Sequence, residues 1–362
     1  MISFPTQLNE IHHRIKSINP EKYQYTRNYI DGAVTYLSPY ISRGVISTKT
    51  VYNHLIKENY PFATIEKYVQ ELAWRDYWQQ VWVHKKDAIN TDLKSQQQKV
   101  ENHEIPRAIL TKSTSINSID KAINVLEDTG YMHNHMRMYV ASVICNIGKS
   151  HWLTPARWMY YHLLDGDWAS NALSWQWIAG TNASRKYYVN QRNINKFFKS
   201  KQQNSYLDYD YDVLINHPCP SELIDTTPLS FKTVLPTTPT INVIPNQPIL
   251  IYNYYNLDPN WRLEGNYNRI LLLEEEFFER YPVAPKNLEF IKLLGTNIKN
   301  LQVYVGSFES LMKTNPNHKI IFKEHPLNNH YKGTQDSRDW MFEVEGYFPS
   351  FFAFWKKCKK QL

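Results

Sequence analysis

Apolar residues recur every three or four positions through much of the first 200 residues. This spacing predicts helices over four stretches, 64–84, 118–127, 131–148 and 155–164. Turn signals separate the helical stretches, at Asn19-Pro20, Ser38-Pro39, Thr129-Gly130 and Asp165-Gly166-Asp167. We therefore expect residues 1–200 to form a helical domain.

The pattern changes after residue 200. Residues 215–248 are rich in Pro and Thr without a helical period, which predicts an extended linker or arm. Beyond it, short apolar runs predict buried strands at 249–254, 269–273, 301–305 and 319–322, and helix-like stretches lie at 286–296 and 307–313. The chain is therefore expected to be mainly α, with a helical domain (1–200), a linker (201–248) and a small α/β, Rossmann-like domain with a parallel sheet (249–362). Glu274–Glu276, at a strand end, are interpreted as a solvated helix start rather than as metal ligands.

Composition narrows the class of protein. The 362 residues are 42% hydrophobic and 21% charged, as in a globular protein, and no apolar run approaches the roughly 20 residues that span a bilayer. The N-terminal segment lacks the pattern of a secretory signal. The three cysteines are scattered, which favours a reducing compartment and excludes a four-cysteine metal or iron–sulfur site. These features predict a cytoplasmic protein without a membrane partner.

Charge and aromatic residues are concentrated in the first 200 residues. The formal net charge is +7; residues 1–200 hold 24 basic and 16 acidic residues, whereas residues 201–350 hold 13 and 18. Eight of the eleven Trp also lie in the first 200 residues. This combination is typical of proteins that bind single strands or flipped bases, but composition alone favours the simpler interpretation of a basic, tightly packed helical domain.

Two segments combine polar with aromatic or hydroxyl side chains. Glu71, Trp74, Arg75 and Trp78 share one helix face, which Trp82 extends. An aromatic stripe usually belongs to a core, so its Glu and Arg either form a structural ion pair or line a cavity. The hydroxyl-rich segment 34–44 can cap a helix or hold a phosphate, and a plain helix cap is the simpler interpretation.

Two further segments place polar groups on helices. In residues 130–138, Asn134, Arg137 and Met138 share a face, whereas His133 and His135 point to different faces and are not expected to share a metal. In residues 165–177, three side chains align at spacings of four, as would suit a planar heteroaromatic ligand: Asp167, Asn171 and Trp175.

Together, these four segments resemble the FAD-binding domain of the DNA photolyase/cryptochrome family. The resemblance covers roughly residues 10–180 and is carried by ELAWRDYW, GYMHNHMRM and LLDGDWASNALSWQW. Because it begins almost at Met1, a short form without the family's N-terminal antenna domain is expected. The C-terminal α/β unit is interpreted either as a relocated, shortened antenna-like domain or as an unrelated stabilising domain.

The resemblance implies a set of functional residues. An FAD would be held by Tyr23, Thr35, Tyr36, Leu37, Ser38, Arg75, Asn134, Arg137, Asp165, Asp167 and Asn171. Arg137 would pair with Asp165, and Asn171 would face flavin N5. The catalytic set would be Glu71, Trp74, Asn134 and Asn171, and DNA would contact Arg27, Glu71, Trp74, Trp78 and Asn134. Electrons would pass through Trp175 and Trp152; the family's outer Trp has no counterpart between residues 95 and 115. No metal is implied, and the identity of any antenna pigment stays open.

The implied activity is that of a deoxyribodipyrimidine photolyase-type lyase. Light-driven electron transfer from reduced FAD would split a cyclobutane dimer flipped out of UV-damaged DNA, and the protein would act as a monomer. Asn134 and Met138 stand where photolyases for (6-4) products carry histidines, which favours cyclobutane dimers. The alternatives are a cryptochrome-like photoreceptor that repairs nothing, and a degenerate scaffold whose pocket is filled by side chains.

Overall fold

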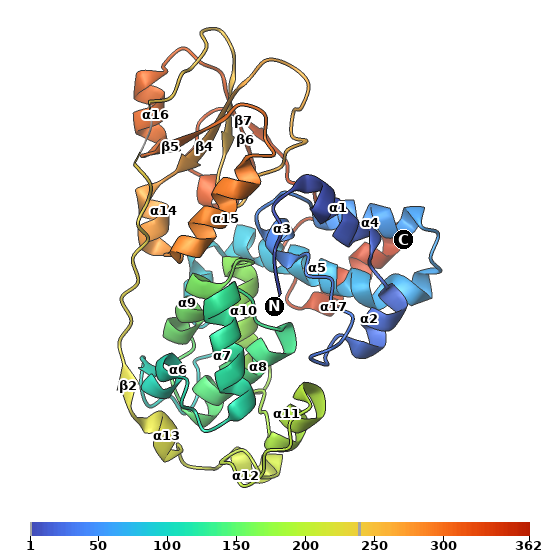
Figure 1. Cartoon of the computed structure of the whole chain (residues 1–362), viewed down its shortest axis with the longest axis vertical. Coiled ribbons are helices and arrows are strands. Elements are labelled where there is room, and N and C mark those ends of the chain that lie inside the picture. The colour runs from blue at the N-terminus through green and yellow to red at the C-terminus, as the bar shows by residue number, and fades with distance from the viewer. Residues whose placement is uncertain (1, 238–239) are drawn as a thin grey trace. The chain divides into compact units, whose positions relative to one another are not determined.

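The computed structural model describes residues 2–237 and 240–362, which form two compact units (Figure 1). Unit 1 consists of Met1–Ile18, Thr35–Val83 and Phe231–Leu362, and unit 2 of Asn19–Val34 and His84–Ser230. The units thus alternate along the chain. The consecutive domain boundaries expected at residues 200 and 248 stay a prediction.

Unit 1 has a helical part built from both ends of the chain. Its helices are α1 (Leu8–Lys16), α3 (Ser38–Ser42), α4 (Thr48–Lys57), α5 (Phe62–Lys85) and α17 (Phe351–Cys358), followed by η4 (Lys359–Gln361). The apolar period that predicts a helix over 64–84 corresponds to α5, the longest helix described. Ser47 closes a capping box at the start of α4, where its side chain accepts from Thr50 N at 2.9 Å.

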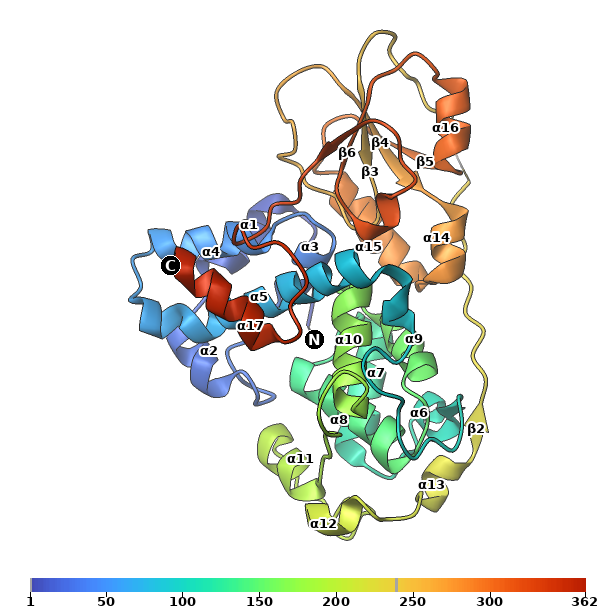
Figure 2. The same ribbon diagram turned by 180° about the vertical axis from the view of Figure 1, so that it is seen from behind.

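The other part of unit 1 is a five-stranded sheet in the order β5-β4-β3-β6-β7, with each neighbouring pair parallel (Figure 2). The strands are β3 (Ile249–Tyr252), β4 (Asn268–Leu273), β5 (Leu301–Val305), β6 (Ile320–Lys323) and β7 (Thr334–Asp336). The helical segments between them are α14 (Glu275–Arg280), α15 (Pro285–Gly295), α16 (Phe308–Thr314) and η3 (Pro326–Asn328). The predicted strands and their parallel arrangement are therefore confirmed, and β7 is an addition.

The three central strands, β3, β4 and β6, are buried and mainly apolar, as is typical of parallel sheets, whereas β5 is half-buried and β7 is largely exposed. On one face, Ile251, Ile270 and Phe322 pack with Phe308 and Leu311 of α16. Glu275 and Glu276 begin α14 in solvent as expected, but Glu274 behaves differently. Its carboxylate accepts from Phe308 N at 2.9 Å and from the Tyr331 hydroxyl at 2.9 Å, so it joins β4 to the loop and helix that follow later strands.

Unit 2 is helical. Its elements are α2 (Pro20–Thr26), η1 (Lys86–Asn90), β1 (Ile105–Pro106), α6 (Arg107–Thr111), α7 (Asn117–Thr129), α8 (Asn134–Ser142), the π-helical turn η2 (Val143–Ile147), α9 (Leu153–His162), α10 (Trp168–Ala179), α11 (Gln191–Phe198), α12 (Tyr211–Leu214), α13 (Ser221–Ile224) and β2 (Thr226–Thr227), which pairs with β1. The helices predicted over 118–127 and 155–164 are confirmed, and the one over 131–148 starts later and ends in the π turn.

Helix α10 lies at the centre of this unit and packs on α8 and α9. It is apolar around most of its circumference, which is typical of a helix surrounded by others. Gly130 ends α7 with a φ of 72°, and a Cβ there would lie 2.5 Å from Leu164 Cγ, so the predicted turn needs glycine. Over residues 2–237 and 240–362, no helix combines the length and the apolar character needed to cross a membrane.

Candidate functional site

The predicted site residues divide between the two units. In unit 2, the expected ion pair between Arg137 and Asp165 is present. Arg137, on α8, donates from Nη2 to Asp165 Oδ2 at 2.9 Å and from Nε to Met132 O at 2.8 Å. The Asp165 side chain is only 3% exposed, whereas that of Arg137 is 20% exposed. A buried carboxylate is thus paired with a guanidinium that still reaches the surface.

Asp167 and Asn171 are oriented by hydrogen bonds at the start of α10. Asp167 is the N-cap residue and accepts from Ser170 N at 2.7 Å. Asn171 donates from Nδ2 to Ala156 O of α9 at 2.8 Å, which turns its amide oxygen the other way. The set therefore offers one cation, two carboxylates and one amide oxygen within a short stretch of α8–α10.

This donor set suits an FAD. A guanidinium stabilises negative charge on a reduced flavin ring, carboxylates accept from ring N–H groups, and an amide oxygen can accept from a protonated ring nitrogen. The flavin ring would be held by Arg137, Asp165, Asp167 and Asn171. When bound, FAD supplies one-electron chemistry.

The predicted residues at the edge of unit 2 are more exposed. Tyr23 and Arg27 lie half-buried on and after α2, where Arg27 donates to Gln24 O. Asn134 is exposed as the first residue of α8. The neighbouring histidines are packed inside: burial lowers the pKa of His133 to about 4, and the His135 ring contacts Asn28 O at 3.1 Å. His133 Nδ1 accepts from His135 N at 3.2 Å and both rings lie against Phe198; that the two histidines share no metal stays a prediction.

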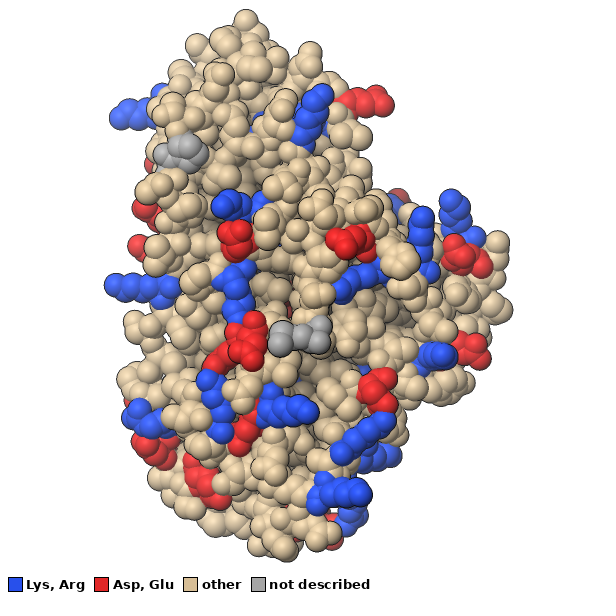
Figure 3. Space-filling model, viewed as in Figure 1, with Lys and Arg blue, Asp and Glu red and all other residues tan. Residues whose placement is uncertain are grey.

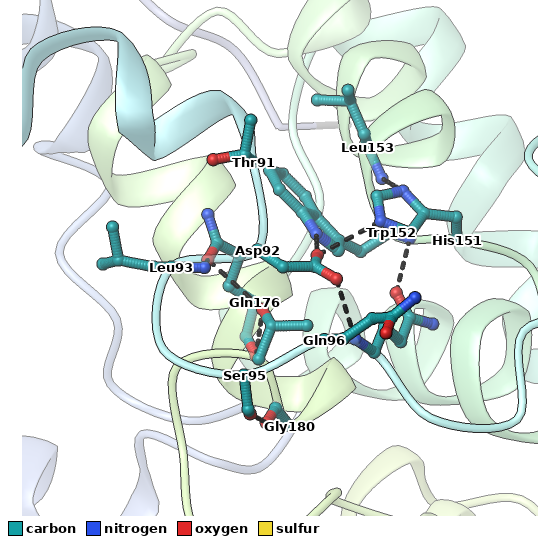
Figure 4. Close-up of polar contacts among 12 residues, drawn as sticks. Thr91, Asp92, Leu93, Ser95, Gln96, His151, Trp152, Leu153, Gln176 and Gly180 are labelled. Atoms are coloured by element: carbon teal, nitrogen blue, oxygen red, sulfur yellow. Dashed lines mark hydrogen bonds and ion pairs between the residues drawn. The ribbon is translucent and has the colours of Figure 1, made fainter.

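The two predicted electron-transfer residues are both buried in unit 2. Trp175 lies on α10, and Trp152 directly precedes α9 with no exposed surface. Trp152 Nε1 donates to Asp92 Oδ1 at 2.7 Å, and Figure 4 shows the carboxylate between the Trp152 indole and the His151 ring. Sequence reasoning missed Asp92, because the segment around it carries no motif. The only available signal is that a buried indole N–H needs an acceptor.

In unit 1, the hydroxyl-rich segment lies against its own helices. Thr35 Oγ1 accepts from the Tyr68 hydroxyl at 3.1 Å, and the Tyr36 carbonyl accepts from Arg14 at 3.3 Å. The N-cap residue of α3 is Leu37, without a side-chain cap. The interpretation of this segment as a plain hydroxyl cap is therefore wrong, because Ser38 is already the first residue inside the helix.

The stripe on α5 is aromatic and polar, as its sequence indicates. Glu71 pairs with Lys67 at 2.9 Å, and Arg75 donates to Ser42 Oγ at 2.8 Å. Trp78 and Trp82 are buried. Trp74 stacks on Phe351 of α17, with ring centroids 3.9 Å apart and planes 10° apart. One face of the Trp74 indole is therefore already covered by another ring of the chain.

A second possible ligand position is the point where the strand order of the sheet reverses, between β3 and β6. Open α/β sheets usually bind ligands at the carboxyl ends of such strands. Here Tyr255, after β3, stacks on His325, after β6, with centroids 4.6 Å apart. The Arg43 guanidinium lies 3.8 Å from the centroid of the Tyr254 ring, and Trp82 packs edge-on against His325. Aromatic and basic side chains that contact one another therefore lie at the carboxyl ends of these two strands.

The class of domain follows from comparison with known families. Residues 68–214 match the family described as the FAD binding domain of DNA photolyase. The resemblance expected from the motifs is confirmed over this range, and the chain contains a photolyase-type FAD-binding domain. Tyr23, Arg27 and residues 35–38 lie outside the matched range.

Individual relatives are photolyases and cryptochromes. The chain is 30% identical to deoxyribodipyrimidine photo-lyase of Alkalihalophilus pseudofirmus over 152 residues, which are 41% of this chain and 32% of that protein. It is also 30% identical to the photo-lyase of Streptomyces griseus over 178 residues, 49% of this chain and 38% of that one. The match thus spans about a third of these relatives. A Synechocystis cryptochrome structure aligns with a TM-score of 0.47 and 22% identity, covering 54% of this chain and 44% of that one.

Proposed function

We propose that the protein is an FAD-dependent, light-driven enzyme that splits cyclobutane pyrimidine dimers in DNA. The observation that carries the proposal is the cluster of Arg137, Asp165, Asp167 and Asn171 within the part of the chain that matches the FAD-binding domain of photolyase. The named relatives are deoxyribodipyrimidine photo-lyases. In this proposal Arg137 stabilises negative charge next to the reduced cofactor, and Asn171 controls protonation at flavin N5.

The proposal assigns DNA recognition to the α5 stripe and to exposed residues of unit 2. Trp74 stacks on a flipped thymine and Glu71 accepts at a base edge. Asn134, in unit 2, is assigned by itself as a hydrogen-bonding residue for DNA. Arg27 contacts a phosphate. Because Phe351 covers one face of Trp74, a base stacks on the other face or after Phe351 has moved.

The same stack favours a second candidate, a cryptochrome-like flavoprotein without repair activity. In that case Trp74 and Phe351 form a permanent contact, and Glu71 remains paired with Lys67. Both candidates use the same FAD-binding residues of unit 2. They differ in whether a flipped base stacks on Trp74 or Trp74 keeps a permanent contact with Phe351.

The test uses the full chain and an oligonucleotide with one cyclobutane thymine dimer. We expect a yellow protein that restores base absorbance under blue light when its flavin is reduced. Trp74→Ala should weaken dimer binding by about 1–3 kcal/mol, the loss typical of one base stack. Trp177→Ala, at a half-exposed Trp on α10, is the matched control and should bind normally. Light-reducible FAD without repair would establish the second candidate, and a colourless protein that takes up no FAD contradicts both.

A further inference from the structure

Asp92 connects three donors that meet beside the buried Trp152. Oδ1 accepts from Trp152 Nε1 at 2.7 Å and contacts His151 Nε2 at 3.1 Å, and Oδ2 accepts from Gln97 N at 2.7 Å (Figure 4). The Asp92 side chain is 18% exposed. The carboxylate is thus largely withdrawn from water and points at an indole N–H.

The indole is also fixed from the other side. Trp152 N donates to Gln97 Oε1 at 3.0 Å, while Gln97 Nε2 donates to Ser150 O at 2.9 Å. Asp92 binds the backbone of Gln97, and Gln97 binds the backbone of Trp152. This closed set of contacts holds the distance between the carboxylate and the indole nitrogen.

An indole N–H can be satisfied by a neutral acceptor and does not require a charged carboxylate. Trp168, in the same unit, uses the neutral Asn90 Oδ1 as its acceptor at 2.8 Å. Placing a charged acceptor in a half-buried position costs desolvation that an amide avoids. His151 offers little compensation at neutral pH, because burial lowers the pKa of its imidazole. The negative charge next to Trp152 therefore points to a state of Trp152 that is positive.

We propose that Asp92 accepts the indole proton of Trp152 when Trp152 is oxidised. This inference rests on the proposed function and on the electron-transfer roles that the family resemblance implies for Trp175 and Trp152, in which Trp175 would give up an electron when a bound FAD is excited by light. Trp152 then gives one electron to the Trp175 radical cation, its Nε1–H bond breaks, and the proton passes to Asp92 Oδ1. The products are neutral Trp175, a neutral Trp152 radical and a protonated Asp92, so charge and atoms balance.

The consequence is a trapped radical at Trp152. Once the proton has left, returning the electron requires the proton to return as well, which slows recombination. The sequence between Trp82 and Trp152 contains no other Trp, so no third indole from that segment can carry the charge outward. In this protein the positive charge leaves Trp152 as a proton that passes to Asp92, instead of passing to a third indole.

The test compares wild type with Asp92→Asn, whose amide oxygen keeps an acceptor but cannot take a proton. After a blue flash on the oxidised, FAD-loaded protein, wild type should show a long-lived neutral Trp radical in its transient absorption. Asp92→Asn should instead show a radical cation, and its long-lived yield should fall about tenfold. His151→Gln should behave as wild type. Asp92→Glu keeps a carboxylate and should still form the neutral radical, which separates loss of the proton acceptor from structural damage at this site. Equal neutral-radical yields in wild type and Asp92→Asn would overturn the proposal.

A second measurement works without flavin. A UV flash ionises tryptophans directly, and subtracting the signal of Trp152→Phe isolates Trp152. Rapid deprotonation of that component in wild type, and its loss in Asp92→Asn, supports the role of Asp92 even if the flavin does not oxidise Trp175. Rapid deprotonation of Trp152 in both wild type and Asp92→Asn contradicts this role of Asp92. If the blue flash gives no Trp radical in wild type but the UV flash shows rapid deprotonation that is lost in Asp92→Asn, the light-driven oxidation of Trp175 has failed and the role of Asp92 as proton acceptor stands.

Discussion

At the scale of single residues, Asp76 on α5 shows how burial changes acidity. Its carboxylate accepts from Thr48 Oγ1 at 2.9 Å and from Met341 N at 3.0 Å. Both bonds favour the charged form, as do the nearby Arg338 and Arg75. Burial outweighs them and raises the pKa of Asp76 to about 6. The folded protein therefore keeps this proton at a pH where the unfolded chain has lost it.

This difference makes stability depend on pH. Between about pH 4 and pH 6 the folded state binds more protons at Asp76, so the free energy of unfolding should fall as pH rises. A shift of roughly two pKa units corresponds to about 3 kcal/mol in total. Asp76→Asn should lose this contribution to the pH dependence, measured as the change in urea-unfolding free energy between pH 4 and pH 7.

The contribution of Asp76 must be measured as the difference in pH dependence between wild type and Asp76→Asn. His133 and His135 have lowered pKa values in the fold, so they destabilise the protein as pH falls, in wild type and variant alike. Asp128→Asn, at an exposed site on α7, serves as the control. The same pH dependence in Asp76→Asn and wild type would contradict the assignment.

At the scale of elements, α17 completes the helical part of unit 1. It buries Phe351, Phe354, Trp355 and Cys358. The segment is anchored at both ends, since the Tyr77 hydroxyl donates to Phe348 O at 3.2 Å and Lys359 pairs with Glu66 at 2.9 Å. A helix of eight residues is not stable alone, so packing holds α17 in place.

Phe351→Leu should separate the two candidate functions. The variant keeps an apolar side chain but removes the ring that stacks on Trp74, and should cost at least about 1 kcal/mol of stability for the lost aromatic pair. If Trp74 receives a base, the dimer-containing oligonucleotide should bind more tightly. Fluorescence anisotropy measures this binding. Phe352→Leu is the control, because the Phe352 side chain is 69% exposed. Unchanged affinity would show that Phe351 does not compete with a base.

The elements differ in how far sequence could predict them. Strand β3 (Ile-Leu-Ile-Tyr) is apolar throughout and β4 contains the apolar run 270–273, so both are identifiable, whereas β7 (Thr-Gln-Asp) is short and polar at the sheet edge. The Arg137–Asp165 pair lies within two recognisable motifs. The contact of Trp74 with Phe351 joins opposite ends of the chain, and no local period carries that information. Asp92 likewise becomes visible only when the fold brings it to Trp152.

At the scale of the whole molecule, the net charge of +7 is distributed unevenly. Figure 3 shows Lys and Arg interspersed with Asp and Glu on the visible face. Several basic residues of the first 200 have local partners, among them Lys112 with Glu127 and Lys149 with Glu101 at 2.6 Å. Because the net charge already counts these acidic partners, the pairs determine which basic residues remain available for phosphates rather than the size of the excess.

The salt dependence of DNA binding should show how many phosphates are contacted. Each contact with single-stranded DNA contributes about −0.7 to the slope of log affinity against log salt concentration. Arg27→Gln should reduce the slope by about one such contact. Arg107→Gln, whose guanidinium pairs with Asp225 at 2.9 Å, is the control and should leave it unchanged. Equal slopes for wild type and Arg27→Gln would contradict the assignment of Arg27.

The alternation of the two units along the chain also affects synthesis on the ribosome. The α5 stripe emerges early, but Phe351 follows more than 250 residues later. At roughly 5–20 residues per second, Trp74 waits some tens of seconds for its cover. During that interval the nascent chain exposes an aromatic face that chaperones bind and that can associate with other chains. Residues 84–230 of unit 2 are synthesised before then, so unit 1 is the later of the two units to complete its fold.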